Sequence, residues 1–161
     1  MEIRDVRLSD TKDILDIYKP YVLNTAVSFE YEVPTLKEFQ TRIENISSKY
    51  PYLVALEDNT IIGYAYASSY SSRAAYKNSV ELSIYLKEGT THHGVGTTLY
   101  NKLLEKLKKQ GIKMVYACIV YPYDTSVNFH YKQGFKMIGV FHQAGYKFDK
   151  YYDVCWMEKE L

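Results

Sequence analysis

The segment 80–104 constrains the fold most, because a strand pattern, a glycine loop and a helix pattern follow one another without a break. Apolar and polar residues alternate over 80–86, which is the period of a half-buried strand. Leucines recur at helical spacing from Leu99 to Leu107, which is typical of an amphipathic helix. The segment therefore predicts a strand, a tight loop and a helix in direct succession.

The loop between the strand and the helix predicts a phosphate site. Gly94 and Gly96 permit a tight turn, and the free amides of a new helix favour an anion. A Walker loop would require lysine after the second glycine, where Thr97 stands. A dinucleotide fingerprint would require a third glycine, where Leu99 stands. Both of these phosphate-binding classes are therefore excluded.

Length and charge limit the remaining possibilities. The chain of 161 residues is 47% hydrophobic, which suits a single domain over 1–161. Its net charge of +1 has no basic cluster, so we expect a small-molecule partner, no nucleic acid and no membrane. Neither a membrane-spanning apolar stretch nor a signal peptide is apparent, which predicts a cytoplasmic protein.

Two residue types call for a specific expectation. Cys118 and Cys155 stand in apolar, strand-like segments without a metal-binding pattern, so we expect buried thiols and no metal site. The chain also has 18 tyrosines, scattered along its length. Because tyrosine combines an apolar ring with a polar tip, several are expected to line a pocket.

The N-terminal region predicts a short strand and two helices. Proline cannot donate a backbone hydrogen bond, so Pro20 is expected to bend or end the first helix at Lys19. Thr35 and Glu38 form a capping box that opens the second helix. The segment 24–32 between them has little periodicity and predicts a loop through which a substrate could enter.

The C-terminal two thirds of the chain predict mostly strands. The segment 113–121 is almost continuously apolar, which indicates a strand buried on both faces. The last two strands are expected to be joined by a long turn. The elements in order are a hairpin over 52–68, a polar crossing over 70–78, the central unit, a strand over 113–121, a helix over 124–133, and strands over 135–141 and 151–157.

Further motifs give the chain a family resemblance. The loop around Gly94 and Gly96 resembles the acetyl-CoA pyrophosphate loop of the Gcn5-related N-acetyltransferases (GNAT), and other matches follow in the order found in phosphinothricin acetyltransferases. These matches are the segments 24–29, 50–55, 73–76, 126–130 and 144–147, with Asp153. The resemblance implies an α/β (α+β) fold with helices on both faces of a mixed sheet that splays between its fourth and fifth strands. It also implies a homodimer.

The same resemblance assigns an acetyl-CoA site. The pantetheine would lie along the fourth strand, and backbone amides of the glycine loop would hold the pyrophosphate. Two positions depart from the family pattern: Thr91 replaces an arginine or glutamine, and Tyr123 replaces an asparagine. The expected contacts are Leu82, Ser83, Ile84, Tyr85, Leu86, His92, His93, Gly94, Val95, Gly96, Thr97 and Ser126.

Acetyl transfer to an amine requires a base, because an ammonium with a pKa near ~10 is mostly protonated at neutral pH. Glu81 stands on the polar face of the central strand and matches the family's proposed general base. His130 matches the position of the proton donor to the leaving thiolate, with Tyr131 as the alternative. The backbone amide of Tyr85 is the expected donor to the oxyanion.

The acceptor is expected to be a small amino acid analogue such as phosphinothricin or methionine sulfoximine. Phe29, Arg73 and Tyr76 match the family's acceptor pocket, and a guanidinium suits a carboxylate. Two alternatives stay open. Another amine, such as a peptide N-terminus or a polyamine, would favour an acidic pocket, and a catalytically weak CoA-binding module would bind the cofactor without turnover.

Overall fold

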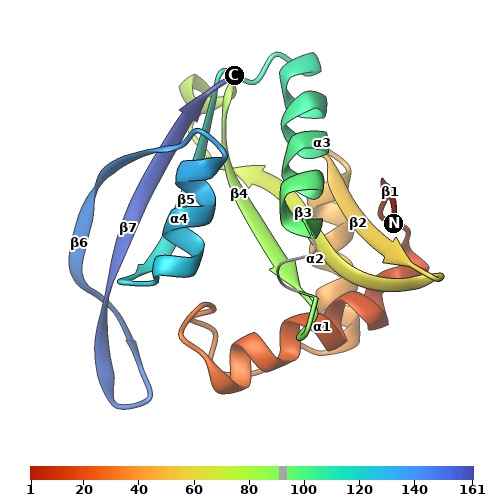
Figure 1. Ribbon diagram of the computed structural model, residues 1–161, viewed down its shortest axis with the longest axis horizontal. Helices are drawn as coiled ribbons and strands as arrows, with labels where there is room; N and C mark the ends of the chain where they lie inside the picture. The colour runs from red at the N-terminus through yellow and green to blue at the C-terminus, as the bar shows by residue number, and fades with distance from the viewer. Residues whose placement is uncertain (91–93) are drawn as a thin grey trace.

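The computed structural model describes residues 1–90 and 94–161 (Figure 1). In these residues the strands form a seven-stranded sheet in the order β1-β2-β3-β4-β5-β7-β6. The strands are β1 (Glu2–Asp5), β2 (Tyr52–Glu57), β3 (Thr60–Ser69), β4 (Ser79–Leu86), β5 (Met114–Tyr121), β6 (Lys136–Lys147) and β7 (Lys150–Glu160). The helices are α1 (Thr11–Asn24), α2 (Leu36–Ser47), α3 (Val95–Lys109) and α4 (Asp124–Lys132), with short 3₁₀ helices at Leu8–Asp10 and Ala74–Tyr76.

The sheet opens between β4 and β5. These strands are parallel and pair only from Ser79 to Glu81, opposite 114–116, after which they diverge (Figure 1). β5 instead keeps its full antiparallel pairing with β7. The predicted splay between the fourth and fifth strands is therefore confirmed, and it leaves one edge of β4 without a neighbouring strand.

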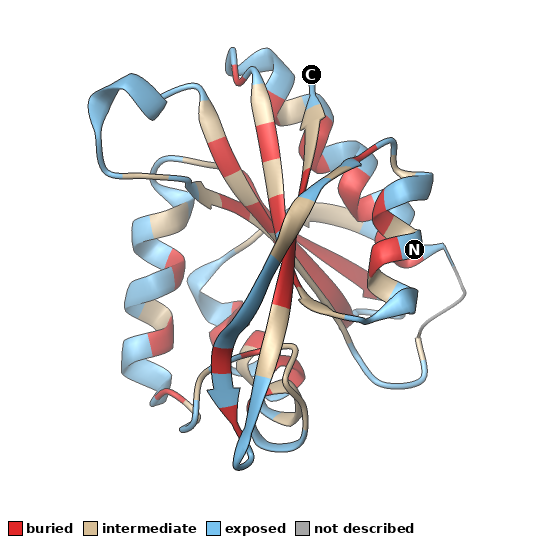
Figure 2. Ribbon diagram, turned by 90° about the vertical axis from the view of Figure 1, so that its left-hand side faces the viewer, coloured by how far each residue is buried: buried red, intermediate tan, exposed pale blue. Residues whose placement is uncertain are grey.

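Helices cover both faces of the sheet, as predicted, and each face has its own core. The leucine stripe of α3 packs on one face with buried residues of β3, β4 and β5. On the other face, Ile14, Val22 and Ile43 of α1 and α2 pack against β2 and β3. Figure 2 shows buried positions concentrated in the strands and on the inward sides of the helices. Among the described helices, none combines the length and the apolarity needed to cross a bilayer.

The first helix does not end at Lys19. It continues through Pro20 to Asn24, so that part of the expectation is wrong. The turn after the proline is stabilised by tertiary contacts, since Val22 is fully buried and the hydroxyl of Tyr21 donates to the carbonyl oxygen of Leu86 at 2.7 Å. Such contacts outweigh the hydrogen bond that proline removes.

The final turn is short rather than long. β6 and β7 are joined by Phe148 and Asp149 alone, with φ angles of 52° and 56°. Two successive positive φ angles are the geometry of a primed hairpin turn, which matches the twist of paired strands. Glycine and asparagine usually mark such turns, and this one has neither residue. The long pairing between β6 and β7 imposes the turn instead.

β5 is buried on one face only, which corrects the prediction of burial on both. Val115, Ala117 and Ile119 are buried against α3, whereas Tyr116 is half-buried and Cys118 is exposed. The splay removes cover from this second face. Cys155, on β7, is buried as expected, but the expectation of a buried thiol at Cys118 is wrong.

Candidate active site

A cavity of about 520 Å³ occupies the opening between β4 and β5. Its walls come from the two strands, the start of α4 and the loop after α1. The opening exists because the strands separate after Glu81, so the fold itself creates the site. The lining residues used below are Ala26, Val27, Ser28, Phe29, Glu30, Glu81, Leu82, Ser83, Ile84, Tyr85, Tyr100, Cys118, Tyr123, Ser126 and His130.

The open edge of β4 offers backbone groups of alternate residues. The hydroxyl of Tyr21 lies 3.3 Å from the amide nitrogen of Leu86 and 2.7 Å from its carbonyl oxygen, whereas the amide of Lys87 donates to Ile62 at the end of β3. Backbone groups alternate sides along a strand. Leu82 and Ile84 therefore present their N–H and C=O groups to the opening, in the manner of an edge strand.

The same alternation bears on the expected oxyanion donor, Tyr85. The backbone of Tyr85 faces β3, where a Cβ at Gly63 would lie 3.2 Å from the Tyr85 carbonyl oxygen. Its amide therefore pairs with β3, and the amide of Ile84 faces the opening instead. The Tyr85 ring packs against Tyr18 and Tyr64, with centroid distances of 5.1 and 5.2 Å.

Glu81 stands at the point where the strands part. It is the last residue of β4 that pairs with β5, and its half-buried side chain lines the cavity. Burial raises the pKa of its carboxyl above the usual value for glutamate. A carboxylate with a raised pKa is a stronger proton acceptor, so Glu81 has the position and the chemistry of a general base.

His130 is buried, with 3% of its surface exposed, and both ring nitrogens have partners. Nδ1 lies 2.7 Å from the carbonyl oxygen of Ser126, and Nε2 lies 2.9 Å from the hydroxyl of Tyr100. A carbonyl only accepts, so the proton is on Nδ1 and Nε2 accepts from Tyr100. Burial lowers the pKa of His130, which keeps the ring neutral at neutral pH.

This hydrogen-bonding arrangement does not fit the predicted acid role of His130. Its Nε2 holds no proton in the neutral tautomer, and Nδ1 donates to the backbone. Tyr131, the alternative donor, is 48% exposed and does not line the cavity. The structure thus places His130 at the cavity and leaves Tyr131 outside it.

The N-terminus of α3 has the expected loop geometry. Gly94 adopts a left-handed φ of 74°, and Val95 begins the helix. A Cβ at Gly96 would lie 3.3 Å from the ring of Phe129, so this glycine lets α3 approach α4 closely. Thr97 is exposed in the first turn of the helix. His92 and His93, together with Thr91, lie outside the described residues.

The three expected acceptor residues are not brought together. Phe29 lines the cavity, whereas Arg73 and Tyr76 are exposed and absent from its lining. Arg73 is the N-cap of the 3₁₀ helix before β4, and Tyr76 ends that helix, where its ring packs edge-on against Tyr70. The family match grouped these residues in one acceptor pocket, but the crossing between β3 and β4 leaves Arg73 and Tyr76 on the exposed surface.

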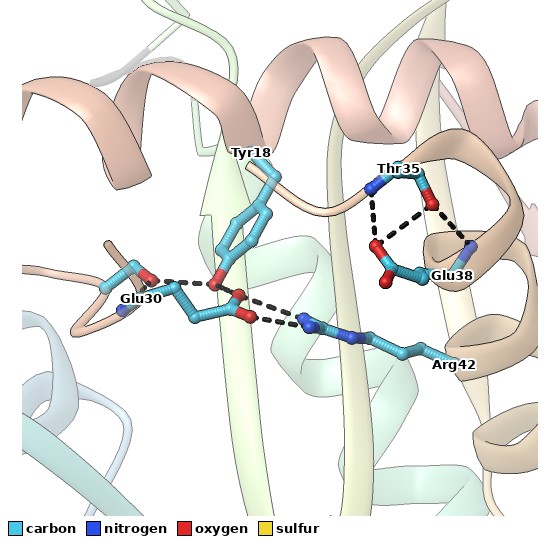
Figure 3. Close-up of polar contacts among 6 residues, drawn as sticks. Tyr18, Glu30, Thr35, Glu38 and Arg42 are labelled. Carbon is cyan, nitrogen blue, oxygen red and sulfur yellow. Dashed lines mark hydrogen bonds and ion pairs between the residues drawn. The ribbon is translucent and has the colours of Figure 1, made fainter. Parts of the chain in front are cut away.

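The loop after α1 is fixed by a polar network that the sequence did not reveal (Figure 3). The Tyr18 hydroxyl lies 2.7 Å from Ser28 Oγ and donates to Glu30 Oε2 at 2.5 Å. Arg42 of α2 binds the same carboxylate through two nitrogens. Arg42 holds the pKa of Glu30 below its usual range, so Glu30 remains an anion that ties α1, the loop and α2 together.

Lys147 is a second anchor of this loop. Its side chain is buried, with 3% exposure, and Nζ donates to the carbonyl oxygens of Val22, Thr25 and Ser28 at 2.7, 2.7 and 2.6 Å. These carbonyls belong to the end of α1 and the loop that follows. One ammonium therefore attaches β6 to the cavity wall. Sequence indicated Lys147 only as a family match, because its partners are more than a hundred positions away.

In the described part of the chain, no group of three or more histidine, cysteine or acidic side chains is placed to hold a metal ion. The sites that could hold a cofactor are backbone ones. The free N–H and C=O groups of Leu82 and Ile84 suit an extended chain with amide bonds, and the N-terminus of α3 suits its phosphates. These features fit the pantetheine and pyrophosphate of acetyl-CoA.

Comparisons with known proteins agree with this geometry. The family model for the acetyltransferase (GNAT) domain matches residues 3–156. A phosphinothricin N-acetyltransferase from Streptomyces viridochromogenes is 34% identical, and the alignment covers 100% of this chain and 88% of that protein. An L-methionine sulfoximine/L-methionine sulfone acetyltransferase from Pseudomonas aeruginosa is 29% identical, with coverage of 99% and 94%.

A solved structure of a GNAT acetyltransferase also has the same fold. The GNAT superfamily phosphinothricin acetyltransferase from Sinorhizobium meliloti, in complex with acetyl-CoA, superimposes with a TM-score of 0.96. It is 33% identical, and the alignment covers 99% of this chain and 88% of that one. The fold and the order of its elements are therefore shared along nearly the whole chain.

Proposed function

Since the chain belongs to the GNAT acetyltransferase family, it is an acetyl-CoA-dependent N-acetyltransferase, and we propose that its acceptor is the α-amine of a small amino-acid-like molecule. Phosphinothricin and methionine sulfoximine are the leading candidates, because the similar proteins from Streptomyces and Pseudomonas carry these names. A cavity of about 520 Å³ is large enough for an acceptor of this size beside the reacting end of the cofactor.

The observation that carries the proposal is the position of Glu81. Its carboxylate lies in the cavity at the start of the open edge of β4, and burial raises its pKa. We assign it the removal of a proton from the acceptor ammonium, directly or through a water. The neutral amine then attacks, so no covalent intermediate on the protein is needed.

The backbone of β4 positions the acetyl donor. Acetyl-CoA supplies an activated acetyl group when it is bound. The free groups of Leu82 and Ile84 would hydrogen-bond the pantetheine amides, and the N–H of Ile84 is our choice for the acetyl carbonyl oxygen, where negative charge develops. Gly94, Val95, Gly96 and Thr97 would hold phosphate at the start of α3. Ser126 lines the opposite wall of the cavity.

We assign His130 a positioning role. As a neutral ring held between Ser126 and Tyr100, it closes the end of the cavity near α4. An unchanged maximal rate in His130→Phe would agree with this role. A loss of about a hundredfold or more, which is the usual size of a lost general acid, would restore the acid assignment.

The acceptor carboxylate requires a cation, and the described cavity lining has carboxylates at Glu30 and Glu81 but no lysine or arginine. We propose that Arg73 turns inward from its exposed position to bind that carboxylate. Arg73→Ala should then raise KM for α-amino acids about tenfold and leave KM for a matched amine without a carboxylate unchanged. Equal KM changes for both acceptors would remove Arg73 from the site.

The decisive experiment measures thiol release from acetyl-CoA with phosphinothricin, methionine sulfoximine, common amino acids, polyamines and short peptides. Acetyl-CoA alone and the Glu81→Gln variant serve as controls. Release that depends on α-amines with a carboxylate supports the proposal. Preference for polyamines or peptides would identify another amine acceptor, and cofactor binding without release would identify a non-catalytic module.

We also propose the compartment, the oligomeric state and the partners of the enzyme. We expect a cytoplasmic homodimer without nucleic acid or membrane partners. Tyr146, Phe148 and Tyr151 leave an exposed aromatic surface at the tip of the β6–β7 hairpin, which a second copy of the chain could cover. Light scattering after size-exclusion chromatography measures the mass, and a monomer at micromolar concentration would contradict the dimer.

A further inference from the structure

The acceptor side of the cavity is a loop backed by the β6–β7 hairpin. Residues 26–30 line the cavity, and Lys147 binds the loop carbonyls from β6. Tyr31 adds a hydrogen bond from its hydroxyl to the carbonyl oxygen of Tyr146. The hairpin therefore fixes the loop at both of its ends, although the two segments are far apart in sequence.

Gly145 is the point at which the hairpin touches the cavity-lining ring of Phe29. A Cβ at Gly145 would lie 2.3 Å from Phe29 Cε2 and 2.4 Å from Cζ, far inside van der Waals contact. Gly145 stands two residues before Lys147 and therefore on the same face of β6. The missing side chain makes room for the ring, while Lys147 holds the loop backbone next to Phe29 in place.

Phe29 lies between the hairpin and the cavity. Its ring is 38% exposed and lines the cavity, whereas Gly145 lies behind it and Tyr152 beside it, at a centroid distance of 6.2 Å. A methyl group at position 145 would thus push the ring toward the acceptor. Because the clashing atoms are at the far end of a rotatable side chain, the fold itself can survive the substitution.

We infer that Gly145 determines acceptor size by setting how far Phe29 projects into the cavity, with Lys147 as the positioning residue that holds the Phe29 loop against β6. This inference rests on the proposed function, since it takes the Phe29 wall to face the acceptor. It deepens that function by naming a specificity determinant that does not itself line the cavity.

Gly145→Ala and Gly139→Ala form a matched pair for the test. Both glycines are in β6, but a Cβ at Gly139 would meet nothing within 4 Å. The experiment measures kcat/KM for α-amino acids of increasing side-chain size, and KM for acetyl-CoA. In Gly145→Ala we expect kcat/KM for the largest accepted side chain to fall about tenfold relative to the smallest, with KM for acetyl-CoA within about twofold of the parent. Gly139→Ala should match the parent.

A double-mutant cycle with Phe29→Ala separates this mechanism from general damage to the hairpin. If Gly145 acts through the ring, its substitution should have less than about a twofold effect on acceptor preference once the ring is gone. An undiminished effect, a uniform loss for all acceptors, or an equal effect of Gly139→Ala would overturn the inference. Rates of the parent enzyme test the proposed function separately.

A structural measurement keeps the inference testable even without turnover. A crystal structure of Gly145→Ala should show the Phe29 ring moved into the cavity, with β6 and Lys147 in place. An unmoved ring, accommodated by a shift of β6, would overturn the inference. A parent enzyme that acetylates no acceptor would overturn the proposed function.

Discussion

Two walls of the cavity are built in different ways, one from β4 with the start of α3 and the other from the loop after α1. The wall formed by β4 and the start of α3 uses backbone groups, which are fixed by strand alternation and by the glycine at the head of a helix. The loop wall, residues 26–30, has no regular structure and is held by the side chains of Lys147, Tyr18 and Arg42. Under the proposed function, backbone groups bind the cofactor that the family shares, whereas a loop held in place by distant side chains selects the acceptor.

Glu81 belongs to the β4 wall, at the point where β4 and β5 part, and its loss should have the largest effect. Glu81→Gln should lower kcat by about 10²- to 10⁴-fold near neutral pH, the usual contribution of a general base. The loss should shrink as pH rises, because free amine then becomes abundant. In the parent enzyme kcat/KM should rise as pH increases through a pKa above that of an ordinary glutamate, since the raised pKa must be exceeded before the base is ionised.

Stopped-flow or thiol-release assays over a pH series measure this profile. The exposed Glu57, at the end of β2, provides the control substitution Glu57→Gln, which should leave the profile unchanged. A Glu81→Gln variant with the parent pH profile and rate would remove Glu81 from the mechanism.

Lys147→Met should break the loop wall alone. It leaves three backbone carbonyls without their donor, so the free energy of unfolding should fall by about 1–3 kcal/mol. KM for the acceptor should rise, because the Phe29 loop loses its anchor, while KM for acetyl-CoA should stay near the parent value. Urea denaturation and steady-state kinetics measure the two effects.

Lys150→Met is the matched control for Lys147→Met. Lys150 is exposed at the start of β7, with Nζ 5.1 Å from the centroid of the Tyr152 ring. Its substitution should change the free energy of unfolding by less than about 0.5 kcal/mol, the usual range for surface positions. Equal losses of unfolding free energy in both variants would mean that the three hydrogen bonds of Lys147 do not stabilise the fold.

Gly96→Ala should affect the backbone wall, with a smaller effect. The added methyl would lie 3.3 Å from the Phe129 ring and 3.5 Å from Ile84, so α3 must shift by a few tenths of an ångström. Overpacking of this kind costs about 1 kcal/mol. Isothermal titration should therefore show acetyl-CoA affinity reduced a few-fold, with KM for the acceptor unchanged. A reversed pattern would contradict the division between the two walls.

The smallest expected effect concerns Cys118, whose thiol lines the cavity and can be labelled chemically. Although Cys118 is accessible to solvent, the surrounding cavity walls partly desolvate its thiolate, and this desolvation, with a contribution from Glu81, raises the pKa of the thiol to about 12. Alkylation by iodoacetamide should therefore be slow at neutral pH and rise about tenfold per pH unit. Acetyl-CoA should protect the thiol, and Cys118→Ser should remove the label, as mass spectrometry of the labelled peptide would show. Rapid labelling at pH 7 would contradict the raised pKa.

Several features of the backbone wall could be predicted from local sequence. Alternation over 80–86 gave the central strand, the leucine spacing gave α3, and Gly94 and Gly96 gave the loop between them. The edge of the strand that each amide faces, on which the choice of Tyr85 as oxyanion donor depends, could not be predicted in this way. Alternation of side chains does not say which edge of a strand is open, and the structure directs the Ile84 amide to the opening instead.

The loop wall was much less accessible to sequence analysis. Phe29 was identified through family resemblance, and it does line the cavity, but Arg73 and Tyr76 do not. Nothing local marks Lys147 or Gly145 as partners of the loop, because each acts on residues more than a hundred positions away. Polar anchors of this kind depend on how β6 packs against the end of α1, and no local sequence pattern predicts that packing.

The sequence by itself thus determined the order of the strands and helices, the glycine turn before α3 and the acidic residue on the central strand. These features follow from short-range physics, namely side-chain alternation, helical spacing and the backbone freedom of glycine. Only the tertiary structure decided which edge of β4 is open, which tautomer His130 adopts, and which distant lysine and glycine place the Phe29 ring. Those features depend on desolvation and on contacts between segments that chain order does not bring together.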